Sequence, residues 1–162
     1  MFHRMLMARP NSSRALVLIV DDSEDMRRYL RFLLELDSYQ VETASSGAEA
    51  LEQISQGCSP AVVLLDLQMP GMDGMQTLQL LKKLRPELKV IMCSGVDDPG
   101  VSRRASLLGA QTYLVKPVQH LYLSAAVEQC LKEKGDESST IEPIGSTVIT
   151  LPSPSRYEEK EN

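Results

Sequence analysis

The chain has 162 residues, of which 43% are hydrophobic and 4% aromatic, and it contains no tryptophan. This length suits one compact domain with some additional residues at its ends. The formal net charge of −5 argues against a nucleic-acid-binding surface, and no apolar run approaches the ~20 residues that cross a membrane.

The N-terminal residues and the cysteines indicate the cellular compartment in which the protein is expected. The N-terminal residues are basic but lack the apolar core of a secretory signal, and the true start is left open between Met1 and Met7. Cys58, Cys93 and Cys130 form no C-x-x-C pair, so we expect reduced thiols. We therefore predict a cytoplasmic protein, with neither nucleic acid nor a membrane among its partners.

The first predicted strand is the apolar run 15–20, which is typical of a strand buried on both faces. A helix is expected from about Ser23, because Met26, Leu30 and Leu33 share one helical face. The alternating stretch 40–44 predicts a second strand, with one exposed side.

Ser46 is predicted to begin the second helix through a capping box. Its hydroxyl would accept from the amide of Glu49, and the Glu49 carboxylate would reach back to the Ser46 amide. The helix is expected to run to about Gln56 and to end at Gly57.

The remaining pattern repeats strand and helix three times. The strands are predicted at 61–65, 88–93 and 111–115, and the helices at 74–84, 99–109 and 118–131. Strands that alternate with helices in this way predict an α/β fold with a parallel sheet and helices on both faces.

The pattern divides the chain into three parts. Residues 15–132 are predicted to form the domain, and residues 1–14 to be a flexible extension. Residues 133–162 are rich in Ser, Thr, Pro, Glu and Gly, which indicates a flexible tail. Within that tail the stretch 146–151 (STVITL) has β character, and docking on the domain or on a partner is the alternative to a free tail.

Three acidic residues follow two of the predicted strands. Asp21 and Asp22 come directly after the first strand, and Asp66 comes directly after the third. The carboxyl ends of parallel strands meet at one edge, so the three carboxylates are expected to converge and to need a cation. Oxygen ligands suit Mg²⁺. Solvated loop residues or helix caps are the alternative.

Ser94 and Lys116 end the fourth and fifth strands at the same predicted edge. Taken singly, they read as a turn residue and a surface charge. With the acids they make up the set needed for phosphoryl transfer to a carboxylate, in which a lysine and a hydroxyl bind the charge of the phosphoryl group.

Four stretches of the sequence resemble the response-regulator receiver family of two-component signalling, in its stand-alone, chemotaxis-regulator-like form. They are LVLIVDDSEDMRRYL (16–30), VVLLDLQMPGMDG (62–74), VIMCSG (90–95) and GAQTYLVKP (109–117). The resemblance covers residues 15–131. It implies a flavodoxin-like (βα)5 sandwich whose five-stranded parallel sheet has the order 2-1-3-4-5.

The resemblance also implies a role for individual residues. Asp66 would be the phosphoacceptor, and Mg²⁺ would be held by Asp21, Asp22, Asp66 and the backbone carbonyl of Gln68. Ser94 would bind phosphoryl oxygens when the switch is on.

Further implied features lie near the fifth strand. Lys116 would pair with the phosphoryl group or with Asp66, and the Lys116–Pro117 peptide bond would be cis. Tyr113 would be the switch aromatic that turns inward as Ser94 moves, with an exposed tyrosine as the alternative. Asp73 is interpreted as the N-cap of the third helix.

These features predict a phosphorylation-dependent switch rather than a conventional enzyme. A histidine kinase or phosphorelay partner would load Asp66, and the face of the fourth helix, fifth strand and fifth helix would signal to an effector or to a second copy. A phosphatase with an aspartate nucleophile is disfavoured, because Gln68 stands where its second acid would be. A degenerate receiver is disfavoured by the intact site. A fragment of a longer regulator or hybrid kinase stays open.

Overall fold

The computed structural model describes residues 14–133. The expectations for the N-terminal extension and for the tail, including the stretch 146–151, lie outside the described residues. No helix of the described part is long and apolar enough to cross a membrane.

Within residues 14–133, five parallel strands form one sheet with the order β2-β1-β3-β4-β5, as predicted. The strands are β1 (Arg14–Val20), β2 (Tyr39–Ala44), β3 (Val62–Asp66), β4 (Lys89–Ser94) and β5 (Thr112–Val115). β3 is buried along its whole length, which fits its continuous apolar sequence and its central place in the sheet.

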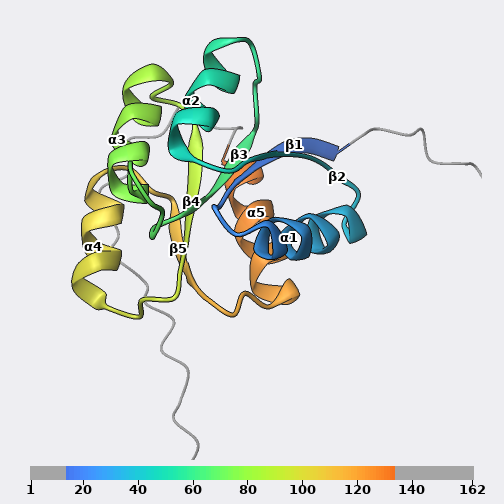
Figure 1. Cartoon of the computed structure of the whole chain (residues 1–162). Coiled ribbons are helices and arrows are strands. Elements are labelled where there is room, and N and C mark those ends of the chain that lie inside the picture. The colour runs from blue at the N-terminus through green and yellow to red at the C-terminus, as the bar shows by residue number, and fades with distance from the viewer. Residues whose placement is uncertain (1–13, 134–162) are drawn as a thin grey trace, which may run out of the picture.

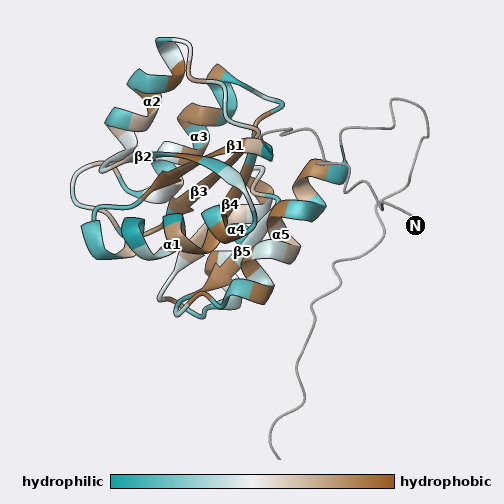
Figure 2. Cartoon of the chain, turned by 90° about the vertical axis from the view of Figure 1, so that its right-hand side faces the viewer, coloured by the Kyte–Doolittle hydropathy of each residue, from teal (hydrophilic) through white to brown (hydrophobic). Residues whose placement is uncertain are grey.

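In the part of the chain that the structure describes, five helices cover the two faces of the sheet (Figure 1). They are α1 (Glu24–Leu36), α2 (Gly47–Ser55), α3 (Gly74–Leu84), α4 (Pro99–Leu107) and α5 (His120–Lys132). α1 and α5 enclose one apolar core with the sheet, and α2, α3 and α4 enclose the other. Figure 2 shows the hydrophobic strands between the two helical layers, whose outer surfaces are more hydrophilic. The flavodoxin-like architecture is therefore confirmed.

The helix starts follow the predicted capping residues, with one correction. Asp73 caps α3 through a complete capping box with Gln76, as its predicted role requires. The Ser46 hydroxyl accepts from the amide of Glu49 at 3.1 Å, also as predicted. The Glu49 carboxylate, however, does not return to Ser46. It accepts from both the amide and the hydroxyl of Ser45 at 2.7 Å.

Three boundaries differ from the prediction in ways that affect the site. Asp66 and Ser94 are the last residues of β3 and β4, so the ladder hydrogen bonds extend to the residues that carry the polar groups. α5 begins at His120 and not at Val118. The cis Lys116–Pro117 bond, which was predicted, precedes a buried Val118 that packs into the α1 and α5 core before the helix starts.

Candidate functional site

The strand register brings the polar residues to one edge of the sheet. Asp66 pairs with Cys93, the neighbour of Ser94, and Ser94 pairs with Val115, the neighbour of Lys116. Asp21 directly follows β1, and its amide donates to the carbonyl of Ala44 at the end of β2. The carboxyl ends of β1, β3, β4 and β5 therefore bring these side chains to one region, as the sequence predicted, and the end of β2 adds a backbone hydrogen bond to Asp21.

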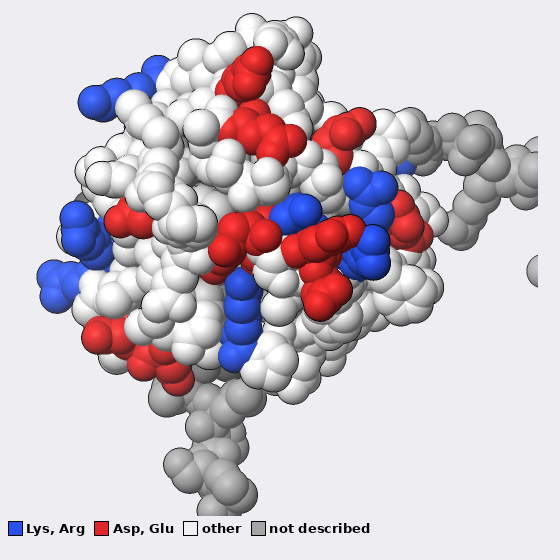
Figure 3. Space-filling view, in the orientation of Figure 1, with Lys and Arg blue, Asp and Glu red and all other residues white. Residues whose placement is uncertain are grey.

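Three carboxylates lie close together at this edge. One oxygen from each of Asp21, Asp22 and Asp66 lies within 4.8 Å of the others. Asp21 and Asp66 are buried, whereas Asp22 is exposed. Figure 3 shows acidic side chains gathered at the centre of this face, with basic side chains beside them. A donor set made only of oxygen, open to water on one side, has the composition that Mg²⁺ prefers.

Lys116 connects the two buried carboxylates. Its Nζ donates to Asp21 Oδ2 at 2.8 Å and lies 3.2 Å from Asp66 Oδ1. The backbone amide of Ser23 donates to the other oxygen of Asp21 at 2.9 Å, so this carboxylate is held from both sides. The amide of Gln68 makes a long 3.4 Å hydrogen bond to Asp66 Oδ1. Asp66 therefore has fewer close donors than Asp21.

The pKa values of this group reflect burial and charge. Burial raises the pKa of Asp66, the charge of Asp21 raises it further, and Lys116 opposes both without cancelling them. Burial alone would lower the pKa of Lys116, but its hydrogen bonds and ion pairs with Asp21 and Asp66 outweigh that effect and raise it. Lys116 thus remains an ammonium group, and the ionised form of Asp66 benefits from any further positive charge.

Ser94 and Tyr113 both form hydrogen bonds to the backbone of Val96, one to its amide and one to its carbonyl. Ser94 is fully buried, and its hydroxyl accepts from the amide of Val96 at 3.1 Å. The hydroxyl of Tyr113 donates to the carbonyl of Val96 at 2.6 Å. The Tyr113 ring is half-buried and packs on the core beneath α2, α3 and α4. The loop between β4 and α4 is therefore held by both residues that the sequence assigned to a switch.

Sequence reasoning missed three contributors to this region. Val96 acts through its backbone, which leaves no pattern in the side chains. Arg27 donates from its guanidinium to the carbonyl of Asp21 at 2.8 Å. Gly74 begins α3 against β3, and a Cβ there would lie 2.3 Å from the carbonyl oxygen of Asp66. The Asp-Gly pair at the start of the predicted third helix was the only available signal for this close approach.

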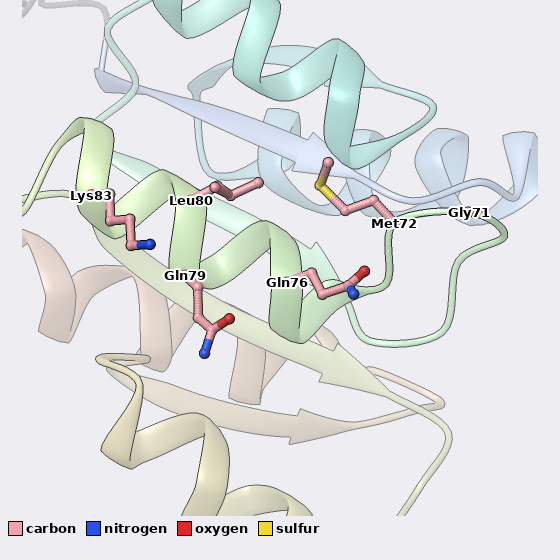
Figure 4. Close-up of a pocket in the computed structure, with 6 residues that line it drawn as sticks. All are labelled: Gly71, Met72, Gln76, Gln79, Leu80 and Lys83. Atoms are coloured by element: carbon pink, nitrogen blue, oxygen red, sulfur yellow. The ribbon is translucent and has the colours of Figure 1, made fainter.

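A separate pocket lies on the side of α3 and holds none of these polar residues. It has a volume of about 490 Å³, is open to solvent, and appears in Figure 4. Its lining comes from the loop after β3 and from α3: Gly71, Met72, Gln76, Gln79, Leu80 and Lys83. The convergent carboxylates, lysine and serine are therefore the candidate site, and this pocket is not part of it.

Comparison with known proteins agrees with this geometry. Residues 17–128 match the model of the response regulator receiver domain. Chemotaxis protein CheY of Bacillus subtilis is 33% identical over 116 residues, which span 71% of this chain and 96% of that protein. This chain belongs to the response regulator receiver family. It is a CheY-like receiver domain of two-component signalling, and not a conventional enzyme.

Solved receiver structures superpose on this receiver. A receiver domain protein from Clostridium thermocellum has a TM-score of 0.70 at 37% identity, covering 74% of this chain and 96% of that one. The CheY chain in the CheX–CheY–BeF3–Mg²⁺ complex of Borrelia burgdorferi has a TM-score of 0.69 at 28% identity, covering 72% and 89%.

Some relatives are longer than this receiver. The uncharacterized transcriptional regulatory protein YkoG of Bacillus subtilis is 30% identical over 125 residues, which span 77% of this chain but only 54% of that protein. The chain thus spans nearly all of CheY and about half of YkoG.

Proposed function

We propose that this receiver is a Mg²⁺-dependent phosphorylation switch that accepts a phosphoryl group on Asp66. The observation that carries the proposal is the position of Lys116, whose ammonium group lies between the carboxylates of Asp21 and Asp66. An ammonium group and two neighbouring acids around one buried carboxylate are the parts that phosphoryl transfer to an aspartate needs.

The donor would be the phosphohistidine of a histidine kinase or a phosphorelay protein, met in the cytoplasm. An oxygen of Asp66 attacks the phosphorus, the bond between phosphorus and the histidine nitrogen breaks, and that nitrogen leaves with the electron pair and then takes up a proton. Lys116 already lies 3.2 Å from Asp66 Oδ1 and binds the negative charge that the new phosphoryl group brings.

Asp21, Asp22, Asp66 and the carbonyl of Gln68 would hold the Mg²⁺ ion. When bound, the ion neutralises charge on the phosphoryl oxygens. The raised pKa of Asp66 supports a need for such a cation, because burial and the nearby Asp21 disfavour its charged form. Hydrolysis of the aspartyl phosphate would reset the receiver.

The output would begin at Ser94. Its hydroxyl would leave the amide of Val96 and donate to a phosphoryl oxygen, which removes one of the two hydrogen bonds that hold Val96. The other bond comes from Tyr113, so the position of that ring would change with the loop. The face of α4, β5 and α5 would then differ between the two states and bind an effector or a second copy.

The match to YkoG supports a second candidate context. Because the chain matches only about half of that protein, the same switch would act within a longer response regulator or hybrid kinase, and its output would pass to an attached domain.

The phosphoacceptor is tested by intact mass spectrometry with acetyl phosphate and Mg²⁺. Wild type should gain one phosphoryl group, and Asp66→Asn should gain none. Asp97→Asn, which removes an exposed carboxylate from the loop after β4, is the matched control and should label like wild type. Full labelling of Asp66→Asn would exclude Asp66 as the acceptor.

A further inference from the structure

The outer edge of β5 is open within the described residues. β5 is the last strand of the sheet and pairs with β4 on one side, and no strand in residues 14–133 pairs with its other side. The strand is only half-buried, and Val115 at its end is 39% exposed. An open strand edge presents backbone donors and acceptors to any further strand.

An exposed aromatic side chain flanks this edge on the side of α5. Tyr122 on α5 is 46% exposed. His120 and Ser124 of α5 both bond to Asp37 after α1. Tyr122 lies two residues from each of them along the helix, which is about 200° around its axis, so it projects from the opposite side of α5. Tyr122 therefore lies on the flank of α5 that faces away from α1 and toward the β5 edge.

The stretch 146–151 (STVITL) is the segment of this chain best suited to such an edge. It consists of β-branched residues, serine and leucine, which favour strands. Twelve residues, 134–145, separate it from the end of the described structure. An extended linker of that length reaches roughly 40 Å, against roughly 13 Å for the length of β5. The segment can therefore reach either end of the strand.

Charge favours β5 over the opposite edge of the sheet. Residues 134–162 hold six acidic and three basic residues, a net charge of −3. α4 beside β5 carries the exposed Arg103 and Arg104 in its middle, and the exposed Asp97 and Asp98 precede its first residue. In Figure 3 basic side chains gather on the left, over α4. β2 at the other edge carries the exposed Glu42, which would repel an acidic segment.

The positions of the helices decide whether a strand added beside β5 would run parallel or antiparallel to it. α5 lies on the same face as α1, whereas α3 and α4, which connect strands in the direction of β5, lie on the other. A parallel strand beyond β5, reached through α5, would make a left-handed crossover, which folds avoid. An antiparallel strand avoids this arrangement, and the twelve-residue linker is long enough to allow it.

We propose that residues 146–151 pair as an antiparallel sixth strand with the open edge of β5 in the same molecule. Tethering gives the segment an effective concentration on the order of millimolar, which favours this occupant over a separate peptide. The docked strand covers Val115 and the adjoining flanks of α4 and α5, so the receiver occludes its own surface. This docking is proposed for the unphosphorylated receiver, so its test needs no phosphoryl group on Asp66.

Amide hydrogen exchange on the full chain tests the proposal. Residues 147–151 and the outer amides of β5 should exchange about tenfold or more slowly in wild type than in Ile149→Pro, which removes a central strand amide. Ile141→Pro, which places the same change in the linker, should exchange at 147–151 like wild type. NMR contacts between α protons of 146–151 and 112–115 should show antiparallel pairing.

Three results would overturn the proposal. Fast exchange at 147–151 in wild type would show that the segment is not docked. Equal loss of protection in Ile141→Pro and Ile149→Pro would show that position 149 has no special role. Protection that appears only as the chain dimerises, followed by analytical ultracentrifugation, would make a second copy the occupant.

Discussion

Lys116 Nζ lies 2.8 Å from Asp21 Oδ2, and this ion pair joins the end of β1 to the residue that follows β5. The two strands are separated in the sheet by β3 and β4. The pair therefore connects the carboxyl ends of β1 and β5 across β3 and β4, and the Lys116 ammonium group lies between the carboxylates of Asp21 and Asp66.

Replacement of Lys116 by methionine should destabilise the fold in the absence of Mg²⁺. Asp21 and Asp66 would lose their shared ammonium group while staying buried, and we expect the free energy of unfolding to fall by about 2 kcal/mol. Urea unfolding at neutral pH measures the change. Lys83→Met, an exposed lysine on α3, is the control and should unfold like wild type. An unchanged midpoint in Lys116→Met would contradict the bridging role.

Gly74→Ala should be strongly destabilising. The new Cβ would lie 2.3 Å from the Asp66 carbonyl oxygen and 2.6 Å from Leu67 Cα, and neither backbone atom can move aside without shifting β3. We expect a loss of about 2–3 kcal/mol in urea unfolding. Gly95→Ala meets nothing within 4 Å and should be nearly neutral. Equal stability of the two variants would show that α3 does not depend on this contact.

Tyr113→Phe should loosen the loop between β4 and α4. The variant keeps the ring but loses the 2.6 Å hydrogen bond to the Val96 carbonyl, which is expected to cost about 1 kcal/mol. Amide exchange in the segment 96–98 should become faster. Tyr122→Phe removes a hydroxyl from an exposed ring and serves as the comparison. If both variants exchange like wild type, Tyr113 does not hold the loop.

Stability should fall as the pH rises above 9, because of the buried thiols. Burial raises the pKa of Cys130 to about 11 and that of Cys93 to about 12, from 9.0. Above pH 9.0 and below the folded-state pKa of each thiol, the unfolded chain has lost protons that the folded chain keeps. The free energy of unfolding therefore falls as the pH rises. The contribution approaches about 1.4 kcal/mol per pH unit for each thiol.

Urea unfolding between pH 8 and pH 10.5 checks this dependence. Cys130→Ala removes one of the two thiols and should lose less stability over that range than wild type, whatever its stability at pH 8. Parallel curves for the two proteins would show that Cys130 titrates alike in the folded and unfolded states.

The sequence could predict the sheet and the site because both rest on patterns that span many residues. Apolar runs and helical faces placed every strand to within a residue or two, and the position of Asp66 at the end of a strand implied its neighbours. What stayed hidden depends on single backbone atoms. Three such features leave no periodic pattern in the sequence: the preference of Glu49 for Ser45, the close approach of Gly74 to β3 and the two hydrogen bonds to Val96.

Asp66 lies at the end of a fully buried central strand, whereas Ser94 and Tyr113 act on the largely exposed loop after β4, where each makes one hydrogen bond to the backbone of Val96. Phosphorylation would thus occur at the end of a rigid strand, whereas the response to it would begin in a less constrained loop. Substitutions in the loop after β4 would alter how long or how strongly the receiver responds while leaving its capacity to be loaded unchanged. Evolution can therefore adjust the timing of the signal without disturbing the chemistry that starts it.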